Sequence, residues 1–225
     1  MTEGEIFAVL TGDIVDSSEL NGGRGYPISK IVENVEKMIF NTYRSSIYRN
    51  IDVFRGDSWQ MVVLDPCHSL RIALLFRALL RSGKSIESTD SRVSIGFGRI
   101  EYLPENDISA GNGEAFRLSG AGLDQCSRSQ RLNLVFPPVN RSSLTEGLKA
   151  LIQFIDFQAQ RWTSKQSDVI AGALVGLTQQ EIASDWVHDP VTQQAVSQHL
   201  DNAGWNPISS SIRHFEAILP EILYL

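Results

Sequence analysis

The sequence predicts an α+β protein in which a ferredoxin-like or palm-like sheet domain is followed by a small all-α domain that carries a helix-turn-helix. Strand and helix signals alternate in the order β-α-β-β-α-β-α-β as far as Pro137-Pro138. One strand pair forms a tight hairpin inside the crossovers, which is typical of such sheets with helices on one face. Beyond the two prolines we find only helix signals. The expected domains are residues 1–138 and 139–225.

The expected strands are short and mostly apolar. Ile6 to Val15 is a nearly continuous apolar run that ends in Gly-Asp, as a buried strand does. Two later runs are joined tightly through Gly56-Asp57-Ser58, which is typical of a hairpin. The expected strands cover residues 6–15, 51–55, 59–64, 92–102 and 132–136.

Three helical segments are expected between these strands. The first carries Ile31, Val35 and Met38 among apolar residues that are spaced three and four apart, so one of its faces is apolar. The expected helices cover residues 29–48, 68–81 and 114–126.

Capping boxes mark the helix starts of the second domain, because Ser or Thr is followed three residues later by Glu or Gln. The patterns are Ser143-x-x-Glu146, Thr163-x-x-Gln166 and Thr178-x-x-Glu181. They predict helix starts near residues 144, 164 and 179. Asp189 as an N-cap before Pro190 predicts a fourth start, and that helix should end at about Ala203, before Gly204.

The last two of these helices form the predicted helix-turn-helix, which resembles that of sigma-factor-type bacterial regulators. Ile182 and Ala183 in the first helix should pack against Val196 and Leu200 in the second. The opposite face carries Gln and Ser, which can hydrogen-bond base edges in a major groove. The predicted DNA-binding residues are Thr192, Gln193, Gln194, Ser197 and Gln198.

Charge argues against a general affinity for nucleic acid. The formal net charge is -6 at pH 7, and residues from Arg141 onward include five basic and nine acidic side chains. Few Lys or Arg side chains are therefore available to contact phosphates. The alternative for this domain is a helical bundle that docks onto the first domain or dimerises.

Composition is that of an ordinary globular protein, with 42% hydrophobic and 20% charged residues. Cys67 and Cys126 match neither a metal-ligand spacing nor a disulfide framework. The first residues lack the basic region of a signal peptide, and Arg71 and Arg77 interrupt the most apolar helix. We expect a cytoplasmic protein with no membrane partner.

Two aspartates indicate a metal and nucleotide site. Asp13 ends the first strand and Asp57 lies in the hairpin turn, and in a palm-like sheet these two strands lie side by side. Paired carboxylates can hold divalent cations that activate a hydroxyl and neutralise a triphosphate. The following turn, Val15, Asp16, Ser17 and Ser18, offers backbone N–H groups and hydroxyls to phosphates. The glycine-rich stretch Gly22-Gly23-Arg24-Gly25 lacks the preceding strand of a P-loop.

Several stretches resemble the catalytic domains of nucleotidyl cyclases. TGDIVDSS is similar to their first metal motif, FRGDSWQMVV to their second, and RVSIGFGRI with GEAFRLSGAGLD to a later strand and helix. Nearly the whole chain resembles the SatD-like family, in which a reduced cyclase-like domain precedes a helix-turn-helix. The resemblance implies that Asp13, the backbone carbonyl of Ile14, and Asp57 bind Mg²⁺ or Mn²⁺ beside a nucleotide.

The chain departs from the cyclase pattern at residues that act on the substrate. Val53 stands where cyclases usually have a purine-reading Lys, and Arg117 and Ala121 stand where they have an Asn and an Arg. Losing such donors raises the barrier by several kcal/mol. Arg55 or Arg117 could replace them as a phosphate clamp, since a guanidinium binds phosphate through two N–H groups.

Three functions are consistent with these patterns. The leading hypothesis is a regulator whose cyclase-like domain binds a nucleotide and a divalent metal, and whose helix-turn-helix binds DNA. The second is an active cyclase that converts a nucleoside triphosphate into a cyclic monophosphate and pyrophosphate. The third is a non-catalytic protein-interaction scaffold. The sequence also leaves open whether the protein forms a homodimer, because cyclase-like sites often lie between two subunits.

Overall fold

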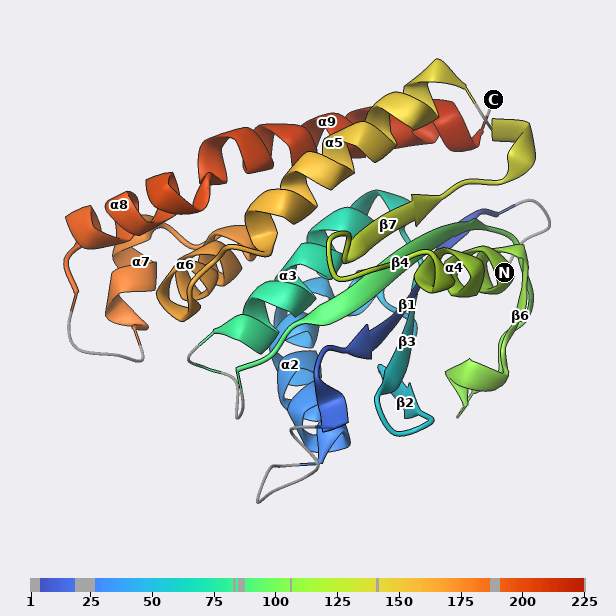
Figure 1. Cartoon of the computed structure of the whole chain (residues 1–225), viewed down its shortest axis with the longest axis horizontal. Coiled ribbons are helices and arrows are strands. Elements are labelled where there is room, and N and C mark those ends of the chain that lie inside the picture. Colours follow the sequence, from blue (N-terminus) through green and yellow to red (C-terminus); the bar gives the residue numbers. More distant parts are fainter. Residues whose placement is uncertain are drawn as a thin grey trace.

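A computed structural model describes residues 5–18, 27–82, 84, 88–105, 107–140, 142–186 and 191–224 (Figure 1). The strands are β1 Phe7–Ile14, β2 Asp52–Phe54, β3 Ser58–Val63, β4 Ser91–Gly98, β5 Ile100–Tyr102, β6 Asn112–Gly113 and β7 Leu132–Val135. The α-helices are α2 Ile28–Tyr43, α3 Ser69–Arg81, α4 Glu114–Asp124, α5 Ser143–Ala159, α6 Ser164–Leu174, α7 Gln179–Ser184, α8 Gln193–Ala203 and α9 Trp205–Leu223. Short 3₁₀ helices are η1 Arg44–Ser46, η2 Pro66–His68, η3 Ile108–Ala110 and η4 Pro138–Asn140. The stretch Gly22-Gly23-Arg24-Gly25 and the proposed cap Asp189-Pro190 lie outside the described residues.

The central sheet has the strand order β2-β3-β1-β4-β7. β1 pairs antiparallel with β3 and β4, β2 pairs antiparallel with β3, and β7 joins β4 in parallel. The first four strands with α2 and α3 therefore have the connectivity of a ferredoxin-like core. The predicted α+β class and the predicted order of elements are confirmed. The predicted strand 92–102 is divided into β4 and β5 at Arg99.

Helices cover both faces of the sheet, so the expectation of helices on one face is wrong. Side chains alternate along β1, and Ala8 and Leu10 join the core under α2 and α3. Val9 packs on the other face with Phe116 of α4. Gly96 of β4 lets α4 approach closely, because an added Cβ would meet the backbone of Ser119. The crossover from β4 to the parallel strand β7 carries α4 onto this second face.

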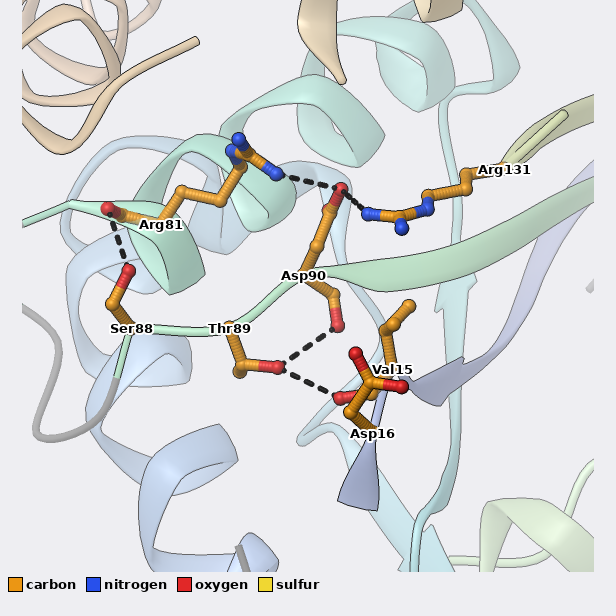
Figure 2. A pocket seen from close by; sticks show the side chains of 7 residues that line it. All are labelled: Val15, Asp16, Arg81, Ser88, Thr89, Asp90 and Arg131. Atoms are coloured by element: carbon orange, nitrogen blue, oxygen red, sulfur yellow. Dashed lines mark hydrogen bonds and ion pairs between the residues drawn. The ribbon is translucent and has the colours of Figure 1, made fainter. Parts of the chain in front are cut away.

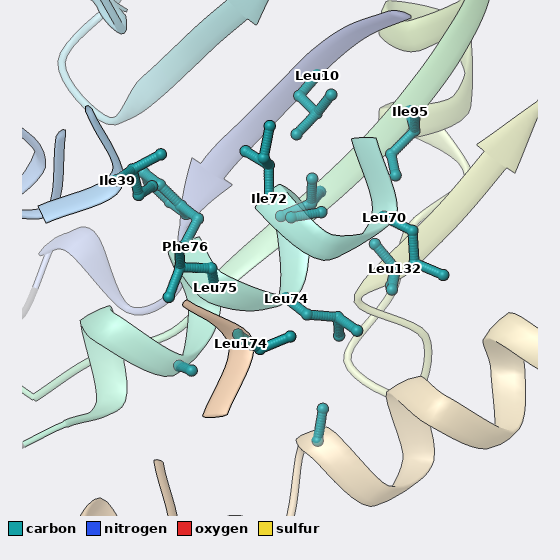
Figure 3. Close-up of a cluster of buried hydrophobic side chains, with 14 of the residues drawn as sticks. Leu10, Ile39, Leu70, Ile72, Leu74, Leu75, Phe76, Ile95, Leu132 and Leu174 are labelled. Atoms are coloured by element: carbon teal, nitrogen blue, oxygen red, sulfur yellow. The ribbon is translucent and has the colours of Figure 1, made fainter. Parts of the chain in front are cut away.

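The C-terminal helices pack against the sheet domain through α3 and share its hydrophobic core. Figure 3 shows Leu74 and Phe76 of α3 in the same cluster as Leu10 of β1 and Leu174 of α6. α5 and α9 lie side by side over this layer (Figure 1), and α5 also contacts β7. The burial of apolar surface between the two parts is the main force that holds them together.

α9 was not predicted from the sequence. Pro207 lies in its first turn, where no intrahelical partner for a backbone N–H is lost, and Pro220 lies near its end. Gly204 separates α8 from α9 in the left-handed conformation, with φ 77°, as the predicted helix stop requires. No described helix is both long enough and apolar enough to cross a membrane.

Two of the three predicted capping boxes are confirmed and one is displaced. The Thr163 and Thr178 hydroxyls each accept from the backbone N–H three residues later. α5 is capped by Ser142 with Thr145, not by Ser143 with Glu146. α8 is capped by Thr192, so it begins three residues later than the Asp189 pattern predicted.

Candidate functional site

The ends of β1 and β3 meet as the sequence predicted. Asp13 is the cross-strand neighbour of Ser58, and the backbone N–H of Ile14 donates to the carbonyl of Asp57 over 3.1 Å. Asp13 and Asp57 therefore come from adjacent strand ends. Asp16, two residues after the end of β1, has a positive φ of 56°, and the chain turns there.

The Asp13 carboxylate is held by an arginine that the sequence analysis did not single out. Arg92 is the cross-strand partner of Asp13 on β4. Its Nε donates to Asp13 Oδ1 over 2.8 Å, and its Nη2 donates to Asp13 Oδ2. The hydrogen bond to Asp13 raises the pKa of Arg92. Both oxygens of Asp13 thus accept from one charged guanidinium, in the bidentate geometry that is strongest for this pair.

The Asp57 carboxylate accepts from a different group. The Ser17 hydroxyl donates to Asp57 Oδ2 over 2.6 Å, which ties the hairpin turn to the turn after β1. The described residues contain no group of three or more His, Cys, Asp or Glu side chains placed to hold a metal ion. Both oxygens of Asp13 accept from Arg92, and Asp57 Oδ2 accepts from Ser17, so this pair of carboxylates lacks the several free oxygen ligands that Mg²⁺ and Mn²⁺ need.

A polar cavity of about 300 Å³ lies beside this turn, and we call it the anion pocket. It is lined by Ile14, Val15, Asp16, Ser17, Ser18, Asp57, Arg92, Ser127, Arg128 and Arg131. Its arginines come from β4 and from the segment between α4 and β7. Within the described part of the chain, Arg128 forms no ion pair, so its guanidinium is available to a ligand.

The predicted cradle of backbone N–H groups is only partly present. The Val15 N–H donates to the carbonyl of Asp90 over 2.9 Å and cannot serve a phosphate at the same time. Ser17 and Ser18 both line the anion pocket, and the Ser17 hydroxyl already donates to Asp57. An anion placed in this cavity would therefore meet guanidinium groups and the Ser18 hydroxyl more than backbone N–H groups.

A second cavity of about 300 Å³ adjoins the anion pocket, since both are lined by Val15, Asp16 and Arg131. Figure 2 shows Arg81 and Arg131 approaching the Asp90 carboxylate from two sides. Burial opposes ionisation of Asp90, but Arg77, Arg81 and Arg131 outweigh it and lower the pKa of Asp90 to about 2. The floor of this cavity is therefore a permanently charged cluster at neutral pH.

The same cluster connects the pocket to the C-terminal helices. The fully buried Arg77 donates to Asp90 Oδ1 over 2.9 Å and to Asp156 Oδ1 of α5 over 2.6 Å. The backbone N–H of Arg131 donates to the other oxygen of Asp156 over 2.6 Å. Arg81 donates to the carbonyl of Trp162, just after α5, over 2.6 Å. Residues of the pocket wall and residues of α5 thus share one hydrogen-bond network.

The two arginines proposed as phosphate clamps have different positions. Arg55 lines a third cavity, of about 540 Å³, together with Asp13, Arg92 and Asp124. Arg117 lies on the exposed side of α4, pairs with Glu101 over 3.1 Å and lines none of these three cavities. Arg55 therefore remains beside Asp13, whereas Arg117 does not reach the site.

The predicted DNA-reading residues lie at the start of α8. Thr192, Gln193, Gln194 and Gln198 are exposed, and Ser197 is half-buried. Two of the five side chains already have partners within the chain: Thr192 caps the helix, and Gln198 donates to Asn202 over 3.1 Å.

Sequence reasoning missed Arg81, Arg92, Arg128 and Arg131 as residues of the site. Arg92 stands at the start of a predicted strand, and strand alternation would place it on the face of Asp13 once the register between β1 and β4 is known. Arg128 and Arg131 lie in a polar connection before β7, where a local pattern cannot show that they reach the turn after β1.

The chain has a distant likeness to a solved structure. No protein-family model matches the chain, and no curated protein matches it. Among solved structures, the chain is similar to the active GGEEF domain of a diguanylate cyclase from Vibrio cholerae, with a TM-score of 0.41 and 13% sequence identity. The match covers 59% of this chain and 83% of that domain.

Proposed function

We propose that the protein is a regulator that binds the phosphates of a nucleotide in the anion pocket and responds through its C-terminal helices. One residue supports both halves of this proposal. The Arg131 side chain lines the pocket and donates to Asp90 over 2.9 Å, and its backbone N–H donates to Asp156 of α5. A phosphate that attracts the Arg131 guanidinium would compete with Asp90 and so alter the network that holds α5.

The phosphate class follows from the chemistry of the pocket wall. Arg92, Arg128 and Arg131 line a small polar cavity together with Ser17 and Ser18. Arginine binds phosphate through two parallel N–H groups, and the Ser18 hydroxyl can donate to a further oxygen, whereas the Ser17 hydroxyl already donates to Asp57.

A thermal-shift screen tests whether the protein binds a nucleotide. The protein is melted with each of the four nucleoside triphosphates and with inorganic tripolyphosphate. At a ligand concentration of about 100 times Kd, binding stabilises the fold by roughly 2.7 kcal/mol, which is a readily measured rise in Tm. Arg128→Ala should lose most of this rise, whereas Arg117→Ala, an exposed arginine outside the pocket, should keep it. No rise with any of the five compounds would refute the proposal.

For the output of the C-terminal helices we propose DNA recognition by α8. The supporting observation is that α6, α7 and α8 contact one another, while Gln193, Gln194 and Gln198 remain exposed on one helix. No Lys or Arg occurs between Thr178 and Ala203. Binding should therefore depend on base contacts more than on phosphates, with an unusually shallow salt dependence.

Fluorescence anisotropy with a pool of random duplex DNA, followed by selection of bound sequences, tests this output. A Gln193→Ala/Gln194→Ala double variant should lose the selected binding, and Gln153→Ala, an exposed glutamine on α5, should retain it. If no sequence is enriched, the DNA output is wrong and the helices act on a protein. The cyclase alternative is the weaker one, because Val53 and Ala121 provide no donor to a substrate.

A further inference from the structure

The structure assigns the anion pocket to an oligophosphate group that binds without a divalent cation on Asp13. Arg92 supplies the positive charge that the cation would otherwise bring. This inference rests on the proposed function, since it specifies how the same pocket holds the nucleotide. Four features of the described residues support it.

The first feature is the fixed position of Arg92. Asp13 and Arg92 face each other across two neighbouring strands in the middle of the sheet, in an unbroken antiparallel register from Phe7 to Ile14. The guanidinium remains charged at every physiological pH, so it competes with a cation for Asp13 under all ordinary conditions. The Asp13 side chain is only 17% exposed, which leaves little room for hydrated metal beside the arginine.

The second feature is the state of Asp57, the other expected ligand. Its Oδ2 accepts from Ser17, and it lines the anion pocket, whereas Asp13 lines the larger cavity with Arg55. The two carboxylates therefore open into different cavities on either side of Arg92, which lines both. A cation bridging them would have to displace the Arg92 guanidinium.

The third feature is the balance of charge on the pocket wall. Arg92, Arg128 and Arg131 outnumber Asp16 and Asp57. Arg92 and Arg131 are already shared with Asp13 and Asp90, but each guanidinium has more N–H donors than these pairs use. Arg128 adds a positive charge that has no partner in the described part of the chain.

The fourth feature is size. The anion pocket and the adjoining cavity each measure about 300 Å³ and share Val15, Asp16 and Arg131. Each lies at the lower end of the range for ligand sites, roughly 300–1,000 Å³. The lining is polar, and none of its residues is aromatic, so we expect the phosphate chain to be held more strongly than the base.

Isothermal titration calorimetry in two buffers tests the inference. ATP, GTP and inorganic tripolyphosphate are titrated into the full chain, once with EDTA and once with excess Mg²⁺. We expect binding in EDTA that is as tight as in Mg²⁺ or tighter, because Mg²⁺ neutralises the phosphates that the arginines bind. Arg92→Gln and, separately, Arg128→Ala should each weaken binding in EDTA by about tenfold or more, and Arg117→Ala should leave it unchanged.

The outcomes separate this inference from the proposed function. Binding that requires Mg²⁺ or Mn²⁺ would overturn the inference and leave the nucleotide proposal intact. Saturable binding of Mn²⁺ alone, abolished by Asp13→Asn, would overturn it too. No binding in either buffer would refute both. If Arg92→Gln fails to fold, the Arg128→Ala comparison and the two-buffer comparison on the wild-type chain still decide the question.

Discussion

Arg77 of α3 and Asp156 of α5 form an ion pair that is almost completely buried, with 2.6 Å between Arg77 Nη1 and Asp156 Oδ1. Arg77 also pairs with Asp90, which directly precedes β4. One guanidinium therefore joins the sheet, the helix that covers it and the first helix after Pro137-Pro138. The two parts of the chain are connected by a charged group as well as by apolar packing.

Arg77→Met should destabilise the fold by about 3–5 kcal/mol, because it leaves Asp90 and Asp156 charged and buried with fewer partners. Chemical denaturation of the two proteins measures this difference. Arg117→Met is the matched control, since its pair with Glu101 is exposed and should contribute less than about 1 kcal/mol. Equal stabilities for the two variants would contradict the role given to Arg77.

Acid should weaken the fold through Asp90. Its pKa is lowered from 3.8 to about 2 in the folded chain, so ionised Asp90 stabilises the fold above about pH 4. That contribution, at most about 2 kcal/mol, is lost as the pH falls from about 4 toward 2. Thermal melts from pH 6 to pH 2 should therefore show a smaller pH dependence for Asp90→Asn than for the wild type. Parallel curves would show that Asp90 does not drive the acid response.

Two glycines of α4 should respond oppositely to alanine. A Cβ on Gly122 would collide with Ser94 and Val135, so Gly122→Ala should destabilise by about 1–3 kcal/mol. A Cβ on Gly120 would meet nothing within 4 Å, so Gly120→Ala should stabilise the helix by up to about 1 kcal/mol. Urea denaturation of both variants provides the measurement. A stabilising Gly122→Ala would mean that α4 does not pack on the sheet at this distance.

The thiols should be unreactive in the folded chain. Burial raises the pKa of Cys126 to about 12 and the pKa of Cys67 to about 11, so neither forms much thiolate at pH 8. Labelling with Ellman's reagent should be slow for both and should become fast only in denaturant. If native protein is labelled rapidly and Cys126→Ser removes that labelling, the packing of Cys126 against β4 is contradicted.

Local patterns predicted the elements well because their causes are local. The apolar run of β1, the Gly56-Asp57 hairpin and the Thr163 and Thr178 caps each depend on residues a few positions apart. The N-cap of α5 was predicted one residue too late because Ser142 and Ser143 are adjacent, and the local pattern cannot choose between them. α9 was missed because Gly204, Pro207 and Pro220 are residues that commonly end or break helices. Gly204 and Pro207 stand at the start of this helix, where they are compatible with it, and Pro220 lies inside it.

The site was harder to predict because its key contacts are not local. Asp13 and Arg92 are 79 positions apart, and their pairing depends on the register between β1 and β4. The carboxylates of Asp13 and Asp57 suggested a cation site from their positions alone, but no local pattern shows that Arg92 pairs with Asp13. The link from Arg131 to Asp156 likewise requires that the C-terminal helices pack on the sheet domain.

Hydrogen–deuterium exchange with and without saturating nucleoside triphosphate tests the central claim most directly. We predict slower exchange in the turn at residues 15–18 and in residues 127–131, together with a change in either direction at residues 156–162, which Asp156 and Trp162 connect to the pocket. Arg128→Ala should remove all three effects. Tight nucleotide binding that leaves residues 127–131 unchanged would contradict the anion pocket, and an effect confined to residues 15–18 and 127–131 would contradict the link to α5.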